Sequence, residues 1–129
     1  MKKLKVIIAD DNDEFRFLLS SFLKERMEFD VVAETSSGSE AVMLSTIHRP
    51  DVVFLDINMP ELNGLEAARQ IKQFVPTTKI VLITGMDDGS YRTVAEMIGV
   101  HGFVSKSALP IEFPFVLNQI VSESKESLV

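Results

Sequence analysis

The sequence contains no cysteine and no long apolar run, and these absences exclude several classes of protein. Without cysteine, the chain can form neither disulfide bonds nor thiolate metal sites. No apolar stretch approaches the roughly 18 residues that a membrane span needs. The apolar run at residues 4–9 is broken by Lys5 and followed by two acidic residues, so it is too short for a signal peptide. We therefore expect a cytoplasmic protein without a membrane partner.

Positive charge is also scarce. The 129 residues include 13 lysines and arginines against 19 aspartates and glutamates, which leaves a net charge of −6. Because an acidic domain repels the phosphate backbone, we expect no direct nucleic-acid binding by this chain. An apolar fraction of 46% at this length predicts one globular domain with a real core. We place this domain at residues 1–123, with 124–129 as a frayed polar tail or the start of a linker.

Short apolar runs alternate with helical patterns along the chain, five times in all. The expected strands lie at residues 5–9, 30–34, 52–55, 79–83 and 103–104. The expected helices lie at residues 13–28, 40–49, 62–75 and 91–98, with a last one after Pro110. Strands that alternate with helices predict a parallel sheet with right-handed crossovers and helices on both faces. The predicted fold class is therefore α/β, a doubly wound (βα)5 sheet of five parallel strands.

Two helices carry predictions of their own. In the first, Phe15 falls on the i, i+3, i+4, i+7 stripe that faces a core, together with Leu18, Leu19, Phe22 and Leu23. In the last, Pro114 should distort or delay the helix, because proline lacks the N–H that a helix interior needs. A turn is expected at residues 87–90.

Charged and polar residues follow four of the five expected strands, at the point where each strand ends. They are Asp10 and Asp11 after the first strand, Asp56 after the third, Thr84 after the fourth and Lys106 after the fifth. Any one of them has a plain structural explanation, such as a helix cap or a strand end. Because the carboxyl ends of parallel strands meet at one edge of a sheet, where such folds bind ligands, we expect them to share one crevice.

Three carboxylates in one crevice repel one another and usually need a cation. A set of oxygen ligands suits Mg²⁺ or Mn²⁺ better than zinc. Lys106 can neutralise negative charge that develops on oxygen, and Thr84 offers a hydroxyl donor. With a carboxylate as nucleophile, these are the parts of a phosphoryl-transfer site. The motif holds no obvious general base, which favours a carboxylate that keeps its phosphoryl group for a while over a fast hydrolase.

Taken together and in this order, these motifs resemble the receiver domain of a two-component response regulator, over about residues 3–121. The shared features are the acidic pair, the Asp-x-x-Met-Pro motif that begins at Asp56, the Thr-Gly pair at Thr84, and Lys106. The resemblance implies the flavodoxin-like receiver topology. It also implies a signalling switch that is activated when Asp56, the phosphoacceptor, becomes an aspartyl phosphate.

The resemblance further assigns roles to the neighbouring residues. Asp11, Asp56 and the backbone carbonyl of Asn58 would bind Mg²⁺ directly, and Asp10 would act mainly through a water. Thr84 and Lys106 would contact the phosphoryl oxygens. Phe103 stands where the family has its switch aromatic, three residues before Lys106. On phosphorylation, Thr84 would move toward the phosphate and Phe103 would turn inward, which would reshape the face formed by the fourth helix, fifth strand and fifth helix. Asn58 and Met86 occupy positions that tune dephosphorylation in the family.

The same resemblance implies partners. A sensor histidine kinase or a phosphotransfer protein would donate the phosphoryl group, and an output domain or a target protein would receive the signal. The stretch at residues 102–108 is similar to receivers attached to helix-turn-helix DNA-binding outputs, which would make a longer chain a transcription regulator. A homodimer formed on phosphorylation is compatible with this interpretation.

Three alternatives stay open. The chain can be a stand-alone receiver that acts by protein contact or in a phosphorelay. It can be a binding module that never takes phosphate. An aspartate-nucleophile phosphatase is disfavoured, because such enzymes place an acid/base Asp two residues after the nucleophile, and Asn58 stands there. We therefore expect no enzymatic activity beyond help with the chain's own phosphorylation and dephosphorylation.

Overall fold

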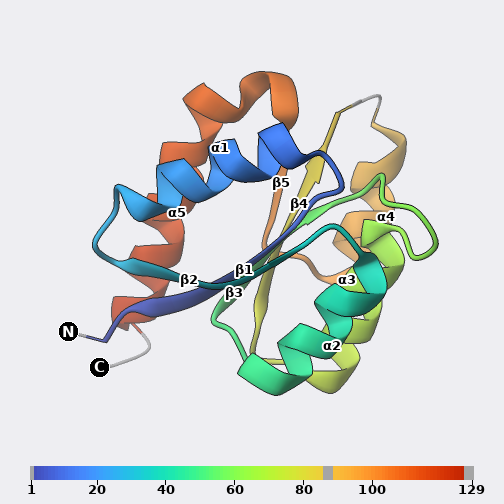
Figure 1. Ribbon diagram of the computed structural model, residues 1–129, viewed down its shortest axis with the longest axis horizontal. Coiled ribbons are helices and arrows are strands. Elements are labelled where there is room, and N and C mark those ends of the chain that lie inside the picture. The colour runs from blue at the N-terminus through green and yellow to red at the C-terminus, as the bar shows by residue number, and fades with distance from the viewer. Residues whose placement is uncertain (1, 86–88, 127–129) are drawn as a thin grey trace.

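A single five-stranded parallel sheet forms the centre of the computed structural model, with the strand order β2-β1-β3-β4-β5 (Figure 1). The structure describes residues 2–85 and 89–126. The strands are β1 (Leu4–Ala9), β2 (Phe29–Thr35), β3 (Val52–Asp56), β4 (Lys79–Thr84) and β5 (Gly102–Ser105). The helices are α1 (Asp13–Lys24), α2 (Gly38–His48), α3 (Gly64–Phe74), α4 (Ser90–Ile98), the short 3₁₀ helix η1 (Lys106–Ala108) and α5 (Leu109–Glu126). The predicted α/β fold is confirmed.

Helices α1 and α5 cover one face of the sheet, and α2, α3 and α4 cover the other (Figure 1). The strands supply side chains to both faces in alternation, since successive residues of a strand point to opposite sides. In β3, for example, Phe54 joins the core under α1 and α5, whereas Val53 and Leu55 join the core under α2 to α4. The sequence of β3 is apolar without interruption because both faces of this strand are buried.

Polar caps define where three of the helices begin. The side chains of Asn12, Ser37 and Asn63 accept hydrogen bonds from backbone N–H groups in the first turns of α1, α2 and α3. The C-terminal limit expected for the first helix is wrong, since α1 ends at Lys24 and not near Glu28. The chain leaves the helix early because the Glu28 carbonyl accepts a hydrogen bond from the N–H of Leu4 (2.8 Å) at the start of the β1–β2 pairing.

Helix α5 runs through Pro114 without interruption, so the expected delay is wrong. The 3₁₀ turn η1 leads directly into α5, which begins at Leu109, and the buried Phe113 ring anchors it edge-on against Phe54 (5.2 Å between centroids). Pro114 lies on the exposed side, so the Pro110 carbonyl, which loses its N–H partner, can bond to water.

The C-terminal part of the chain is helical further than its polar sequence indicates. Helix α5 continues to Glu126, inside the expected tail, and residues 127–129 lie outside the described residues. The division of the chain at residue 123 stays a prediction. Residues 87 and 88 of the expected turn are not described either. None of the described helices combines the length and apolarity that crossing a bilayer requires.

Candidate functional site

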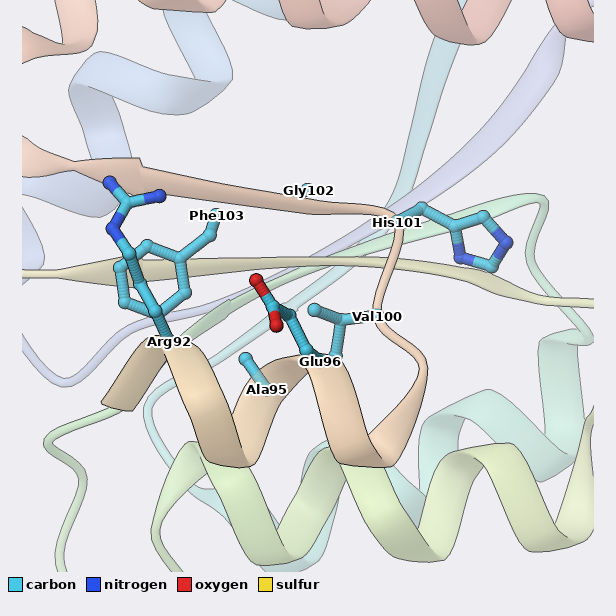
Figure 2. A pocket seen from close by; sticks show the side chains of 7 residues that line it. All are labelled: Arg92, Ala95, Glu96, Val100, His101, Gly102 and Phe103. Carbon is cyan, nitrogen blue, oxygen red and sulfur yellow. The ribbon is translucent and has the colours of Figure 1, made fainter. Parts of the chain in front are cut away.

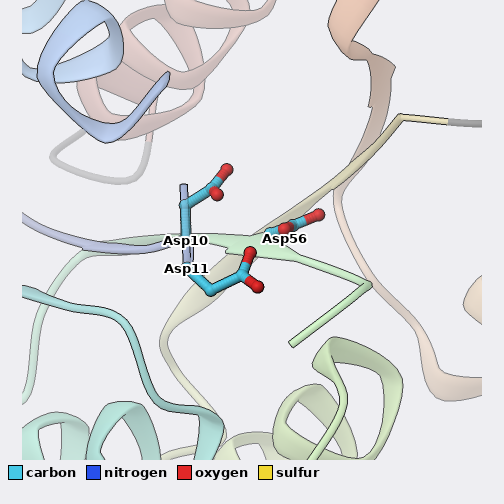
Figure 3. Close-up of side chains that lie close together, drawn as sticks. All are labelled: Asp10, Asp11 and Asp56. Atoms are coloured by element: carbon cyan, nitrogen blue, oxygen red, sulfur yellow. The ribbon is translucent and has the colours of Figure 1, made fainter. Parts of the chain in front are cut away.

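Three carboxylates meet where β1 and β3 end. Ala9 pairs with Leu55 across the two strands, so the next residues along each chain, Asp10 and Asp56, lie side by side. One oxygen from each of Asp10, Asp11 and Asp56 lies within 4.8 Å of the others (Figure 3). Asp10 and Asp56 are buried and Asp11 is exposed. The crevice that the sequence predicts at this edge of the sheet is therefore present, and it opens to solvent on the side of Asp11.

Lys106, the first residue of η1, extends into the same crevice. Its ammonium nitrogen lies 3.1 Å from Asp10 Oδ2 and 3.6 Å from Asp56 Oδ2. The Lys106 side chain is 25% exposed. Two buried carboxylates thus share one lysine, so the positive charge balances only part of the negative charge. The site has a surplus of negative charge that a cation would offset.

The pKa of Asp56 reflects the same surplus of negative charge. Burial, and then the neighbouring Asp10 carboxylate, raise the pKa of Asp56 from 3.8 to about 7. The Lys106 ammonium and a hydrogen bond from the backbone N–H of Asn58 (3.3 Å) act in the opposite direction and do not prevail. Near neutral pH, Asp56 is therefore protonated in a fraction of the metal-free molecules. A divalent cation, which favours the ionised carboxylate, would displace this proton.

The donor set fits a hard divalent cation such as Mg²⁺. The clustered ligand atoms are all carboxylate oxygens, which Mg²⁺ prefers. In residues 2–85 and 89–126, the Oδ2 atom of Asp10 is the buried side-chain polar atom without a well-directed hydrogen bond, although the Lys106 ammonium lies close. The exposed side at Asp11 leaves room for the waters that Mg²⁺ retains. Asn58 lies beside Asp56 through its backbone, and the use of its carbonyl as a ligand stays a prediction.

Two glycines hold the loop that follows Asp56. A Cβ atom on Gly64 would lie 2.2 Å from the Asp56 carbonyl oxygen, and the Gly64 N–H donates to the Ile57 carbonyl (2.8 Å). A Cβ atom on Gly38, at the start of α2, would lie 2.0 Å from the Leu62 carbonyl oxygen. Because only glycine permits such close approach of two backbones, these residues set the position of the loop. The sequence gave no signal that Gly38 contacts this loop.

The two predicted switch residues lie on neighbouring strands. Thr84 ends β4 and is fully buried, and Phe103 in β5 is partly buried. The Arg92 guanidinium of α4 lies over the Phe103 ring, 4.6 Å from its centroid. Arg92 and Phe103 line a cavity of about 130 Å³ between α4 and β5, from which the His101 ring is turned away (Figure 2). A movement of Phe103 would therefore change its contact with Arg92 of α4 directly. Met86 lies outside the described residues.

Two residues of α1 belong to the site although their sequence positions did not mark them as such. The Lys106 ammonium lies over the Phe15 ring, 4.4 Å from the centroid. The Arg16 side chain donates to the Asp10 backbone carbonyl (2.6 Å) and to Asp13 (2.6 Å). The spacing of Phe15 identified it only as a core residue, because a contact with a residue near the other end of the chain leaves no local pattern.

Comparison with known proteins places this arrangement in a family. The family model described as response regulator receiver domain matches residues 6–114. The transcriptional regulatory protein DegU of Brevibacillus brevis is 38% identical over 104 residues, which are 81% of this chain and 44% of DegU. A protein-glutamate methylesterase/protein-glutamine glutaminase of Geobacillus kaustophilus is 36% identical over 112 residues, 86% of this chain and 32% of that protein. The chain thus spans less than half the length of these two relatives.

A solved structure agrees with these matches. The REC domain of AraT, a response regulator from Geobacillus stearothermophilus, has a TM-score of 0.87 and 28% sequence identity to this chain. The match covers 99% of this chain and all of that domain, at 100%. The similarity to AraT therefore extends over the whole fold described above.

Proposed function

The chain belongs to the response regulator receiver domain family, and from this premise we propose that it is a phosphorylation-activated switch whose phosphoacceptor is Asp56. The observation that carries the proposal is the position of Asp56: a buried carboxylate at the end of a central strand, beside two further carboxylates and 3.6 Å from a lysine ammonium. Receiver domains of this family are the phosphoacceptors of two-component systems.

The chemistry that we propose is a transfer to a carboxylate oxygen. An Asp56 oxygen attacks the phosphorus of a phosphohistidine or an acyl phosphate, and a new P–O bond forms. The bond from phosphorus to the donor breaks, and the donor leaves with that electron pair. Lys106 lies where its charge can offset the charge of the phosphoryl oxygens, and the Thr84 hydroxyl is the proposed partner of one of them.

A magnesium ion held by Asp11, Asp56 and the Asn58 carbonyl, with Asp10 acting through water, would stabilise negative charge on the oxygens of the transferred group. The residues of the chain perform the other tasks. The glycine-supported loop presents Asp56 in one orientation. Burial of Asp56 beside Asp10 keeps bulk water away from one side of the carboxylate. We propose that this shielding lets the aspartyl phosphate persist, which a switch requires and a phosphatase does not.

The partners follow from the same proposal. A sensor histidine kinase or a phosphotransfer protein donates the phosphoryl group, and the face made by α4, β5 and α5 transmits the change once Thr84 and Phe103 have moved. The names of the two relatives state different activities, transcriptional regulation in one and methylesterase activity in the other. The similarity therefore supports a receiver and leaves its output open between a DNA-binding domain, an enzyme and a separate target protein. We further propose that the receiver itself is cytoplasmic and is not an enzyme.

The test is the intact mass of the protein after incubation with Mg²⁺ and acetyl phosphate. We expect the mass of one phosphoryl group to be gained by wild type and to be absent in Asp56→Asn and in the presence of a chelator. Asp30→Asn, which removes an exposed carboxylate from β2, is the matched control and should be phosphorylated normally. Phosphoryl gain by a folded Asp56→Asn protein would refute the assignment. Sustained hydrolysis of a phosphomonoester that depends on Asp56 would favour the phosphatase.

A further inference from the structure

The Lys106 ammonium is bounded by two kinds of neighbour. Asp10 and Asp56 lie on one side, at 3.1 and 3.6 Å, and the face of the Phe15 ring lies 4.4 Å away at its centroid. The carboxylates attract the lysine through its charge. The ring attracts it through the negative face of the aromatic quadrupole, without accepting a proton or carrying a charge of its own.

The Phe15 ring is fixed in place by its surroundings. The Phe15 N–H donates to the Asn12 cap (2.8 Å), which holds the first turn of α1. The next residue, Arg16, ties α1 to the end of β1 through the Asp10 carbonyl (2.6 Å). The ring itself is partly buried against the core under α1 and α5. Phe15 is therefore attached to the same backbone that carries the acidic residues, and its ring moves with them.

Lys106, in contrast, depends on its contacts for its position. A lysine side chain has a flexible four-carbon stem and a strongly hydrated head, and here a quarter of it (25%) is exposed. Without the ring, the ammonium could turn toward water or settle on Asp10 alone. The ring restrains the ammonium but leaves its charge available to phosphoryl oxygens, which a third carboxylate in this place would not do.

We propose that Phe15 is a positioning residue for phosphoryl transfer: its ring holds the Lys106 ammonium within reach of Asp56. The inference rests on the proposed function and adds to it a residue of α1. An aliphatic side chain at this position would pack against the core but would have no aromatic face to hold the ammonium.

Three variants separate this role from ordinary packing. Phe15→Leu keeps an apolar side chain but removes the aromatic face, and Phe15→Tyr restores the face. Phe22→Leu is the matched control, because Phe22 is a partly buried aromatic of the same helix that packs against Phe113 (6.0 Å between centroids) and not against Lys106. If Phe15→Leu loses its far-UV circular dichroism, Phe15→Met takes its place as the variant without an aromatic face.

The first measurement is structural and needs neither phosphate nor metal. In the ¹H–¹³C spectrum of metal-free protein, the CεH₂ signal of Lys106 is identified by its loss in Lys106→Met. Ring current should shift this signal upfield in wild type, in Phe15→Tyr and in Phe22→Leu, and the shift should disappear in Phe15→Leu.

The second measurement is the rate of phosphorylation by acetyl phosphate at saturating Mg²⁺, followed by intact mass. We expect a drop of about five-fold in Phe15→Leu, equivalent to about 1 kcal/mol, the size of a partly exposed cation–π contact. Phe15→Tyr and Phe22→Leu should stay within about two-fold of wild type.

The outcomes distinguish the inference from the function on which it rests. If wild type is phosphorylated and Phe15→Leu is equally fast, or if Phe22→Leu is slowed as much, the role of Phe15 is refuted while the receiver function stands. A Lys106 signal that does not change in Phe15→Leu refutes the ring contact itself. If wild type takes no phosphate from acetyl phosphate or from a phosphorylated histidine kinase, the proposed function fails, and the role of Phe15 fails with it.

Discussion

Replacing Asp56 by Asn removes a buried negative charge, and we expect the metal-free variant to be more stable than wild type above neutral pH. The pKa of Asp56 is raised from 3.8 to about 7 in the folded protein, by burial first and by Asp10 second. A carboxyl group with a raised pKa contributes stability that is fully present below its unfolded pKa and is lost as the pH rises through its folded pKa. In metal-free wild type, the loss therefore falls between about pH 4 and pH 7.

The magnitude follows from the same shift. A rise of roughly three pKa units corresponds to at most about 4 kcal/mol of destabilisation once Asp56 is ionised. The exposed side of the crevice lets water screen part of this cost, so we expect about 2 kcal/mol. Asn has the shape of the protonated acid and keeps an oxygen for the Asn58 N–H. The free energy of unfolding of Asp56→Asn should thus exceed that of wild type by about 2 kcal/mol at about pH 8. Near pH 4 the two values should be equal.

Urea unfolding monitored by far-UV circular dichroism, with a chelator present, measures this difference. Fluorescence is unsuitable because the chain has no tryptophan and one tyrosine. Asp30→Asn makes the same change in net charge at an exposed position and should show no such gain. Added Mg²⁺ should stabilise wild type and leave Asp56→Asn nearly unchanged, since binding to the folded state alone raises stability. A gain that is independent of pH, or a loss of stability at pH 8, would refute the reasoning about Asp56.

Three further predictions concern other parts of the fold. Lys106→Ala should still gain phosphate on Asp56 but show a weakened change in hydrogen exchange over α4 and β5, and full exchange changes would contradict the role of this lysine. Gly64→Ala should lower the free energy of unfolding by about 3 kcal/mol, because its Cβ would lie 2.2 Å from a carbonyl oxygen. Gly85→Ala, whose Cβ would meet nothing within 4 Å, is the control, and equal losses would exclude the steric cause. Pro114→Ala should stabilise α5 by about 2 kcal/mol in urea unfolding, since it restores a helix hydrogen bond at an exposed position, and a loss would show that the proline is needed there.

Much of the fold could be predicted because its signals are local. The apolar runs of β3 and β4 identify buried strands within a few residues, and the helix expected at residues 62–75 is present as α3, Gly64–Phe74. The rule that parallel strands carry their ligands at their carboxyl ends then brings Asp10, Asp56 and Lys106 together without any knowledge of distances. The meeting of these three charged residues at one edge of the sheet was therefore predictable from order and spacing alone.

Other features depend on partners that are remote in the chain. Helix α1 ends early because β1 pairs with the segment that follows it, and α5 tolerates Pro114 because the proline faces solvent while Phe113 anchors the opposite side. Helix propensity depends only on residues that are near in the sequence, so it predicts too late an end for α1 and a distortion or delay of α5 at Pro114.

The sequence by itself determined the α/β architecture and the set of strand-end residues, because hydrophobic periodicity and motif order are properties of neighbouring residues. Only the tertiary structure decided the energetics of the site. The raised pKa of Asp56 comes from burial and from a carboxylate on the adjacent strand, and the ring of Phe15 reaches Lys106 because α1 and η1 meet above the same edge of the sheet. Burial and contacts between distant residues arise when the chain packs, and no local pattern records them.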